Sequence, residues 1–477
     1  MGGTARANPG ATLRASAAHT RSLVSDTTQH SADCRATVLG AGIAGTEAAW
    51  QLAQRGVAVT LVEMRPQTMT PAHHTDQFAE LVCSNSLKST DPTTAAGLLK
   101  SELEALNSVV LRVARETQVP AGGALAVDRE QFSARLTELI TAHPGIEIVH
   151  READSIPAGR VIVATGPLTS PALADALADL VGDRLAFFDA AAPIVDAETL
   201  DRSIVFAQSR YDKGGSADYL NAPMTREEYD NFYDALIEAR QAHVKEFERG
   251  ELFQACQPVE EVARTGRDAL RFGALKPVGL TDPRTGERPW AVVQLRAENA
   301  AATAYNLVGF QTNLAFPEQD RVFAMIPGLE QAQFLRHGVM HRNTFLDAPR
   351  VLDATLALRS DPRIRFAGQI TGTEGYAEAA MSGLVAALNT WADLTAGSSV
   401  VLPDTTAFGA LTAYAANPAT TDYQPMHVNF GLVPPLPERV RGKRERYAAY
   451  AERARRDLAA WLAEHPELAA RATCVDA

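Results

Sequence analysis

The chain has 477 residues, of which 46% are hydrophobic and 21% are charged, a composition typical of a folded globular protein rather than a disordered or fibrous one. At roughly 100–200 residues per domain, this length predicts two or three domains. The 45 basic and 57 acidic residues give a net charge of -12, which argues against a protein that coats nucleic acid through bulk positive charge but allows a local basic patch.

The first 34 residues differ from the rest of the chain. They are rich in Ala, Thr, Ser and Arg and lack the apolar core of a secretory signal. Their composition faintly resembles an organellar transit peptide, but a disordered extension is the simpler interpretation, and we exclude 1–34 from the predicted fold. No apolar run reaches the roughly 18–20 residues that span a bilayer, so we expect a cytoplasmic protein with no membrane partner.

The first predicted elements form a strand–helix–strand unit. A short apolar strand is expected at 36–39, a helix at 46–54, and a continuous apolar strand at 57–62, as is typical of a parallel strand buried on both faces. The turn that joins the first strand to the helix has the sequence Gly40-Ala41-Gly42-Ile43-Ala44-Gly45.

This turn matches the fingerprint of dinucleotide-binding domains, because it lies between a strand and a helix and an acid, Glu63, follows 18 residues after the last glycine. Gly40 permits the tight turn, Gly42 lets the backbone approach a pyrophosphate, and Gly45 lets helix and strand pack closely. The pyrophosphate would lie at the helix N-terminus, and Glu63 would accept a hydrogen bond from a ribose hydroxyl. The alternative is a glycine-rich turn without a ligand.

NAD and FAD share this fingerprint, but two later segments favour FAD. A strand predicted at 160–164 leads into Gly166, in a segment similar to the second flavin-contact motif of flavoproteins. A late strand ends near Gly368 and Gln369 and precedes a helix at 376–389, whose N-terminus would face the flavin ring. The chain has no second fingerprint for a nicotinamide, so NADH or NADPH would bind transiently beside the flavin.

The order of the elements predicts an α/β fold in which a Rossmann-type FAD-binding domain is interrupted by a smaller α+β insertion domain. Residues 35–203 would form the first part of the FAD-binding domain. In 204–330 the strands become shorter, around one helix at 226–249, and this insertion is expected to face RNA or substrate. The α/β pattern returns in 331–477, which ends in a charged helix at 438–464. Further helices are predicted at 96–113, 131–142 and 405–416, and further strands at 290–295, 306–310 and 363–367.

Longer segments carry a resemblance to a known family. They are Gly40–Gly45 with Glu63-Met64-Arg65-Pro66, Leu81-Val82-Cys83-Ser84-Asn85-Ser86-Leu87-Lys88-Ser89, Ala126-Val127-Asp128-Arg129, Ala164-Thr165-Gly166-Pro167, Leu275-Lys276-Pro277-Val278-Gly279-Leu280, Gly309-Phe310-Gln311-Thr312-Asn313 and Gly368-Gln369-Ile370-Thr371-Gly372. With these segments the chain resembles the folate- and FAD-dependent tRNA (uracil-5-)-methyltransferases of bacteria over roughly residues 36–440. A sister family of larger flavoproteins, which modify the wobble uridine of tRNA, shares the fold but differs after Cys83.

The resemblance implies a reaction and a set of partners. Methylenetetrahydrofolate would donate a one-carbon unit, reduced FAD would supply electrons, and a uridine in the T-loop of tRNA would become ribothymidine. NADH or NADPH would be the reductant. The expected partners are therefore tRNA, folate and NAD(P)H, with no metal, and the oligomeric state stays open.

Two cysteines in family-like segments, Cys83 and Cys256, are the candidate catalytic residues. Carbon 5 of uracil is a poor nucleophile until a thiolate adds to carbon 6, so the reaction needs a reactive cysteine. Pro258 suits a first helical position, which would place Cys256 just before a helix N-terminus, where the helix dipole favours a thiolate. The resemblance implies that one of the two lies near the flavin and the other in the insertion. We assign Cys256 as the uracil nucleophile and Cys83 as its flavin-proximal partner or proton carrier, and the reverse assignment stays open. The alternative for either is an inert, buried thiol.

Histidines and charged residues outside these segments carry weaker signals. His73 and His74 are expected in a loop or on the surface, and His337 with His341 lacks an acid that would complete a zinc site, so no metal is predicted. Segment 439–456 holds eight Lys and Arg residues and is a candidate contact for the tRNA backbone, with a solvated helix face as the alternative. In the same helix Tyr447, Tyr450, Ala454, Leu458 and Trp461 recur every three or four residues and should dock on the protein.

Two other functions are compatible with the sequence. A flavin oxidoreductase that acts on a small molecule would explain the dinucleotide site but not the segments around Cys83 and Cys256. A non-catalytic, RNA-binding flavoprotein would explain neither cysteine. A related flavoprotein that modifies a different RNA uridine is a further alternative within the same chemistry.

Overall fold

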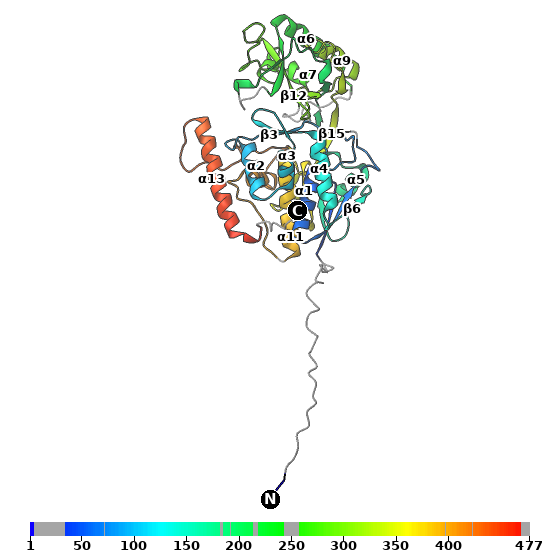
Figure 1. Cartoon of the computed structure of the whole chain (residues 1–477), viewed down its shortest axis with the longest axis vertical. Coiled ribbons are helices and arrows are strands. Elements are labelled where there is room, and N and C mark those ends of the chain that lie inside the picture. The colour runs from blue at the N-terminus through cyan, green and yellow to red at the C-terminus, as the bar shows by residue number, and fades with distance from the viewer. Residues whose placement is uncertain are drawn as a thin grey trace.

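The structure is a computed structural model with two lobes joined by a waist (Figure 1). It describes residues 1–3, 34–70, 72–181, 185–190, 192–212, 218–242, 257–395, 397–421 and 423–468, with only the backbone for 185–190, 212 and 340–344. Within these residues, no helix is both long and apolar enough to cross a bilayer.

The larger lobe is built on a six-stranded sheet with the strand order β16-β17-β7-β1-β2-β6. All neighbouring strands run parallel except the pair β16–β17. The central strands are buried, since Val38, Leu61 and Ile162 are fully inaccessible to solvent, and the sheet is covered by helices on both faces. The strands are β1 (Arg35–Leu39), β2 (Ala58–Glu63), β6 (Ile146–His150), β7 (Arg160–Val163), β16 (Ala357–Leu358) and β17 (Asp361–Phe366).

Two helices from opposite ends of the chain pack together over this sheet. They are α1 (Ile43–Gln54) and α11 (Tyr376–Leu394), and both lie at the centre of the larger lobe (Figure 1). A side chain at Gly383 would collide with the carbonyl oxygen of Ala44, so the glycine permits this close approach. The doubly covered parallel sheet confirms the predicted Rossmann-type fold.

The single helix predicted at 96–113 is wrong, because the structure has two helices there. The first, α2 (Ala95–Ala105), ends before Asn107, whose φ of 56° lies in the left-handed region. The second, α3 (Val109–Glu116), starts at the N-cap Ser108, whose hydroxyl accepts a hydrogen bond from Leu111 N. The apolar spacing continues through this break, which is why periodicity alone did not reveal it.

The smaller lobe contains an antiparallel sheet with the order β10-β11-β12-β13-β9-β14. One face packs against helices through a core that includes Phe232, Leu295 and Phe323. Strands β9 and β14 lie outside 204–330 in the sequence, one before it and one after it, so the sheet extends beyond that interval at both ends. The elements are β9 (Ile194–Asp196), β10 (Phe206–Ala207), β11 (Tyr219–Met224), α6 (Arg226–Glu238), α7 (Val259–Arg264), α8 (Ala269–Phe272), β12 (Ala291–Ala297), β13 (Ala304–Leu307), α9 (Phe316–Phe323) and β14 (Phe334–Arg336).

Two predicted elements of this lobe end early. Helix α6 ends at Glu238, followed by Ala239 in an extended conformation with a ψ of 142°, whereas residues 243–249 of the helix predicted at 226–249 lie outside the described residues. The strand predicted at 306–310 stops at Leu307, shortly before Gly309, whose φ of 81° belongs to a turn. The predicted strand at 290–295 corresponds to β12.

The remaining elements connect the lobes and complete the larger one. They are β3 (Ser86–Ser89), β4 (Gln118–Val119), β5 (Ala124–Val127), α4 (Arg129–Ala142), α5 (Pro171–Val181), β8 (Leu185–Ala190), β15 (Met340–Phe345), α10 (Ala348–Val351), α12 (Ala407–Ala415) and α13 (Lys443–Glu464). Strand β8 pairs with β15 in an antiparallel ribbon at the waist. Helices α4 and α12 confirm the predictions at 131–142 and 405–416.

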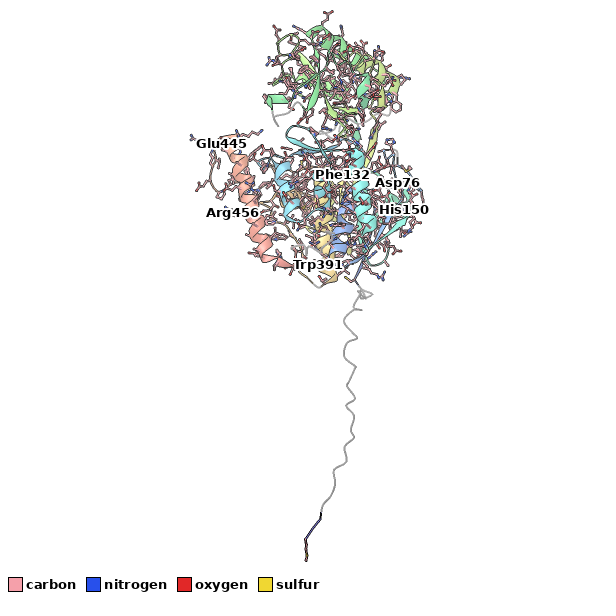
Figure 2. The ribbon with its side chains drawn as sticks, viewed as in Figure 1. Asp76, Phe132, His150, Trp391, Glu445 and Arg456 are labelled. Carbon is pink, nitrogen blue, oxygen red and sulfur yellow. The ribbon has the colours of Figure 1, made fainter. Side chains whose placement is uncertain are left out.

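Helix α13 lies along the outer edge of the larger lobe, where Figure 2 labels Glu445 and Arg456 on it. It begins at Lys443 rather than 438, after Gly442 with a φ of 86°. Ala451, Ala454 and Leu458 are buried, and Tyr447, Tyr450 and Trp461 pack against the same core. The predicted docking face is therefore confirmed.

Candidate active site

The main cleft of the larger lobe lies at the carboxyl ends of the parallel strands. Leu39, Glu63 and Gly368 all line it, and each stands at or just after the end of a strand. The cleft holds about 1040 Å³ of empty space. This is the edge at which open α/β sheets bind their ligands.

The glycine turn forms one wall of the cleft and opens toward it at Gly42. A Cβ at Gly40 would lie 2.8 Å from the carbonyl oxygen of Ala164, and a Cβ at Gly45 would collide with the Gly40 carbonyl. A Cβ at Gly42, by contrast, would meet no atom within 4 Å. Helix α1 begins after Gly42 with no acid in its first turn and no side chain capping it, so its N-terminus can receive an anion.

Glu63 lies at the floor of the cleft as a buried carboxylate. It accepts hydrogen bonds from Ala41 N at 2.7 Å, from Arg65 Nε at 2.9 Å and from Arg65 N at 3.0 Å. Burial alone would raise the pKa of Glu63, but the Arg65 guanidinium and these hydrogen bonds outweigh burial and lower the pKa below its usual value. Glu63 is therefore ionised at neutral pH and can accept further hydrogen bonds.

A loop after β2 supplies a wall of the cleft that sequence reasoning missed. Arg65, Thr70, His73 and Glu80 line the cleft next to Glu63. Burial and the nearby Arg65 lower the pKa of His73 to about 4, so its ring is neutral, and its Nδ1 lies 2.6 Å from the Thr70 hydroxyl. His73 lies in a loop, as predicted, and is partly exposed. Residues 64–80 have no periodic pattern that could have predicted this wall.

The segments at Gly166 and Gly368 also line the cleft, next to the glycine turn. Gly166 and Gly368 have φ values of 65° and 82°, and both line the cleft together with Gln369. Gly368 N donates a hydrogen bond to the Ser382 hydroxyl at 2.6 Å, and Gln369 Nε2 donates to Glu374 Oε2 at 2.6 Å. The structure thus brings into one cleft eight of the predicted dinucleotide-binding residues, namely Gly40, Gly42, Ile43, Ala44, Glu63, Gly166, Gly368 and Gln369. The other two residues of the turn pack within the protein: Ala41 N donates to Glu63, and Gly45 lies against the Gly40 carbonyl.

Cys83 lies beside this cleft. Its N–H donates a hydrogen bond at 3.0 Å to the hydroxyl of Tyr376, and Tyr376 and Val82 both line the cleft. Two guanidinium groups bind the backbone around the thiol, because Arg336 Nη2 donates to Val82 O at 2.6 Å and Arg129 Nη2 donates to Cys83 O at 3.5 Å. A half-buried thiol among cationic groups is the kind of environment in which reactive cysteines occur.

Cys256 lies outside the residues that the structure describes. The helix that follows it, α7, starts at Val259, with Pro258 as its N-cap rather than as its first helical residue. Glu260 in its first turn is buried, and burial raises the pKa of Glu260 to about 7. The Glu260 carboxylate accepts hydrogen bonds from Asn313 N at 2.7 Å and the Thr312 hydroxyl at 2.9 Å, which fixes the start of α7 against a neighbouring turn.

Metal ligation has no support in the described part of the chain, where no group of three or more His, Cys, Asp or Glu could hold an ion. His337 instead pairs with Asp320 at 2.8 Å and stacks on Phe316 and Phe334.

Comparison with known proteins decides which family this site belongs to. The family described as "Glucose inhibited division protein A" matches residues 35–397. A protein of Heliobacterium modesticaldum named "Methylenetetrahydrofolate--tRNA-(uracil-5-)-methyltransferase TrmFO" is 56% identical over 431 residues, which cover 90% of this chain and 98% of that protein. A protein of the same name from Brevibacillus brevis is 54% identical and covers 88% of this chain and 96% of its own length. The chain belongs to the TrmFO family.

Solved structures agree on the fold of this TrmFO family member. The chain superimposes on Aquifex aeolicus GidA with a TM-score of 0.64 at 16% identity, over 91% of this chain and 77% of that one. At this identity the likeness supports the two-lobed architecture alone. The resemblance to the methyltransferase family that the sequence motifs predicted is confirmed.

Proposed function

We propose that this protein methylates carbon 5 of a T-loop uridine in tRNA, with methylenetetrahydrofolate as the one-carbon donor and FAD as the redox cofactor. The observation that carries the proposal is the 56% identity to a TrmFO enzyme over almost the whole of that protein's length. The cleft, with Cys83 beside it, provides a site at which a dinucleotide and a reactive thiol could meet, as this reaction requires. The names of these relatives give methylenetetrahydrofolate and tRNA uracil as their substrates.

The residues of the cleft fit FAD. The open side of Gly42 and the uncapped start of α1 can hold the pyrophosphate, and the ionised Glu63 can accept a ribose hydroxyl. The neutral His73 and the Arg65 side chain would border the same end of the dinucleotide. Gly166, Gly368 and Gln369 would contact the flavin end. Bound FAD, once reduced, supplies the electrons that the transferred carbon needs to become a methyl group.

The two cysteines have different proposed roles. The Cys256 thiolate would add to carbon 6 of uracil, which places electron density on carbon 5 and prepares it for the incoming carbon. Cys83 would serve at the flavin, because its backbone is bonded to Tyr376 in the cleft wall. Arg129 and Arg336 hold the Cys83 segment in place through its carbonyl groups.

The reductant and the tRNA would bind outside the glycine turn. NADH or NADPH would bind transiently, because the sequence has a single dinucleotide fingerprint. The insertion over 204–330 would face RNA, and the exposed cations of α13 would contact the tRNA backbone. The FAD-binding domain would then comprise 35–203 and 331–477 without β9 and β14, which belong to the sheet of the smaller lobe.

The test combines a spectrum with an assay. Purified protein, reconstituted with FAD if needed, should show the visible absorption of oxidised flavin and should methylate a tRNA transcript when methylenetetrahydrofolate and NADH or NADPH are added. A transcript with the target uridine changed to cytidine is the matched control and should stay unmethylated. NAD(P)H oxidation that is indifferent to RNA and folate, with no methyl product, would instead indicate a small-molecule oxidoreductase.

A further inference from the structure

The insertion sheet has one apolar face and one polar face. Leu295 and Leu307 pack into the apolar core, so the alternating residues Arg296 and Asn306, which are directly paired between β12 and β13, lie on the opposite face. This polar face looks toward the larger lobe, since Arg296 Nε donates a hydrogen bond at 2.8 Å to Asn85 Oδ1. In Figure 1, β12 is labelled at the side of the smaller lobe nearest the waist.

Three buried polar atoms on this face have no hydrogen-bond partner within the described residues. They are Nη2 of Arg296, Oε1 of Glu298 and Nδ2 of Asn306, in side chains of residues that are 6%, 5% and 2% exposed. Buried polar groups in native proteins are almost always paired. Glu298 directly follows β12 and its N–H donates to Ala304 O at the start of β13, so these two donors and one acceptor belong to neighbouring parts of one sheet and could together bind a ligand.

The cluster is directly connected to the Cys83 segment. Asn85, which binds Arg296, is two residues from Cys83, and its Nδ2 also donates to Val127 O and Ala297 O. Glu298 pairs through its other oxygen with Arg129 at 2.8 Å, and Arg129 in turn donates to the carbonyl of Cys83. Arg296 and Glu298 are thus linked by hydrogen bonds to the Cys83 segment, and Asn306 is paired with Arg296 across the sheet.

We propose that Arg296, Glu298 and Asn306 bind the –CO–NH– edge of a heterocycle, an inference that rests on the proposed function. Arg296 and Asn306 donate to ring carbonyl oxygens, and Glu298 accepts from the ring N–H. Two donors and one acceptor complement the imide of uracil, which has two carbonyls around one N–H. The pterin ring of folate carries the same carbonyl and N–H pair, so the experiment separates these two sources.

The test removes one unpaired donor and compares it with a paired one on the same face. Asn306→Leu deletes an amide that has no partner at Nδ2, so the melting temperature and FAD content should stay unchanged or rise. Gln294→Leu is the control, because the Gln294 amide already donates to Asn221 Oδ1 at 3.1 Å and accepts from Arg210 Nε at 2.7 Å. This control should lower the melting temperature and leave ligand binding as in the unmodified protein.

Two dissociation constants are measured, one for a T-loop RNA hairpin and one for tetrahydrofolate. Neither measurement requires the enzyme to turn over. Asn306→Leu should weaken one of them about tenfold, the effect of losing one well-placed hydrogen bond. If the hairpin is affected, a hairpin with an abasic target should bind equally to both proteins, which assigns the site to uracil. If only tetrahydrofolate is affected, the site is assigned to the pterin.

Unchanged constants for both ligands would overturn the proposal, and so would a fall in melting temperature like that of Gln294→Leu without a binding defect. Failure of the proposed function looks different. If the unmodified protein transfers no methyl group but Asn306→Leu weakens tetrahydrofolate binding, the proposed heterocycle site is supported and the proposed methylation reaction is wrong.

Discussion

Gly42 and Gly45 belong to the same turn but are glycines for different reasons. At Gly45 a Cβ would collide with the protein itself, whereas at Gly42 it would project into open space. We expect Gly42→Ala to leave the melting temperature of the FAD-free protein unchanged and to weaken FAD binding, because the methyl group takes the place of the pyrophosphate. Isothermal titration with FAD and a melting curve measure both effects.

Gly45→Ala is the matched comparison for Gly42→Ala. It should lower the stability of the FAD-free protein by roughly 1–3 kcal/mol or more, because the turn and α1 must move apart. If the two variants behave alike in the absence of FAD, the distinction between a packing glycine and a ligand-facing glycine is wrong.

The two cysteines can be separated by a covalent trap. Cys256→Ala should not form an adduct with RNA that carries 5-fluorouracil at the target, yet it should retain FAD and its reduction by NAD(P)H, because electron entry needs no uracil adduct. Cys83→Ala should keep the adduct but perturb the flavin spectrum, because the substitution removes a thiol beside the cleft while the backbone hydrogen bond to Tyr376 remains. The measurement is a gel shift of each variant with the modified RNA.

The opposite pattern, an adduct kept by Cys256→Ala and lost by Cys83→Ala, would reverse the assignment. Adducts in both variants would rule out a cysteine nucleophile among these two residues. Ser replacements serve as controls for local packing, because they preserve side-chain size while lowering nucleophilicity.

At the scale of single elements, α13 presents a basic surface beside its docked face. Arg444, Arg455 and Arg456 are exposed, although Arg456 also contacts Asp457. Replacing all three with Gln should raise the Michaelis constant for tRNA several-fold. In a plot of log binding constant against log salt concentration, each lost phosphate contact should make the slope less steep by about 0.7–0.9. Filter binding over a range of salt concentrations measures this.

Glu445→Gln with Glu452→Gln is the control on the same helix, since both acids are exposed and their removal should not weaken tRNA binding. If the triple Gln variant binds tRNA with unchanged affinity and salt dependence, α13 is a solvated helix face with no role in RNA binding.

Helix α12 depends on a buried acid whose protonation changes near neutral pH. Glu102 accepts hydrogen bonds from Ala407 N at 2.6 Å and Phe408 N at 3.1 Å, and burial raises the pKa of Glu102 to about 7. Because the folded-state pKa is above the unfolded one, this group favours folding at low pH, and that contribution is lost as the pH rises toward and through 7. The melting temperature of Glu102→Gln, relative to that of the unmodified protein, should therefore be higher at pH 8 than at pH 5. Parallel melting temperatures of both proteins across this range would contradict the protonation argument.

Local signals explain which elements could be predicted. The glycine turn, the buried strand β2 and the helix α4 have strong local patterns, and α4 also has its N-cap Asp128 in the sequence. The break between α2 and α3 was missed because the capping Ser108 is stabilised from afar, by a hydrogen bond to Glu47 at 2.7 Å. Tertiary contacts of this kind cannot be read from spacing.

For the molecule as a whole, the sequence predicted that an insertion interrupts the dinucleotide-binding fold but not how the lobes meet. Neither Arg296–Asn85 nor Arg336–Val82 follows from any motif, since each contact joins residues more than 200 positions apart. The same holds for His73, which reaches the cleft through an irregular loop. The candidate site was thus predictable where a sequence motif marks a segment, as at Gly40–Gly45, Gly166 and Gly368, and unpredictable where residues outside any motif meet.

The close packing of α1 with α11 also has a consequence for how the protein is made. The ribosome releases β1, α1 and β2 early, but α11, which packs on α1, arrives some 300 residues later. At roughly 5–20 residues per second, the delay is on the order of 15–60 s. The strands of the smaller lobe all emerge within that interval and can pair first. Until the end of that interval the larger lobe lacks β16, β17 and α11, and its cleft lacks Gly368 and Gln369, so we expect it to take up its cofactor only after its last third has been synthesised.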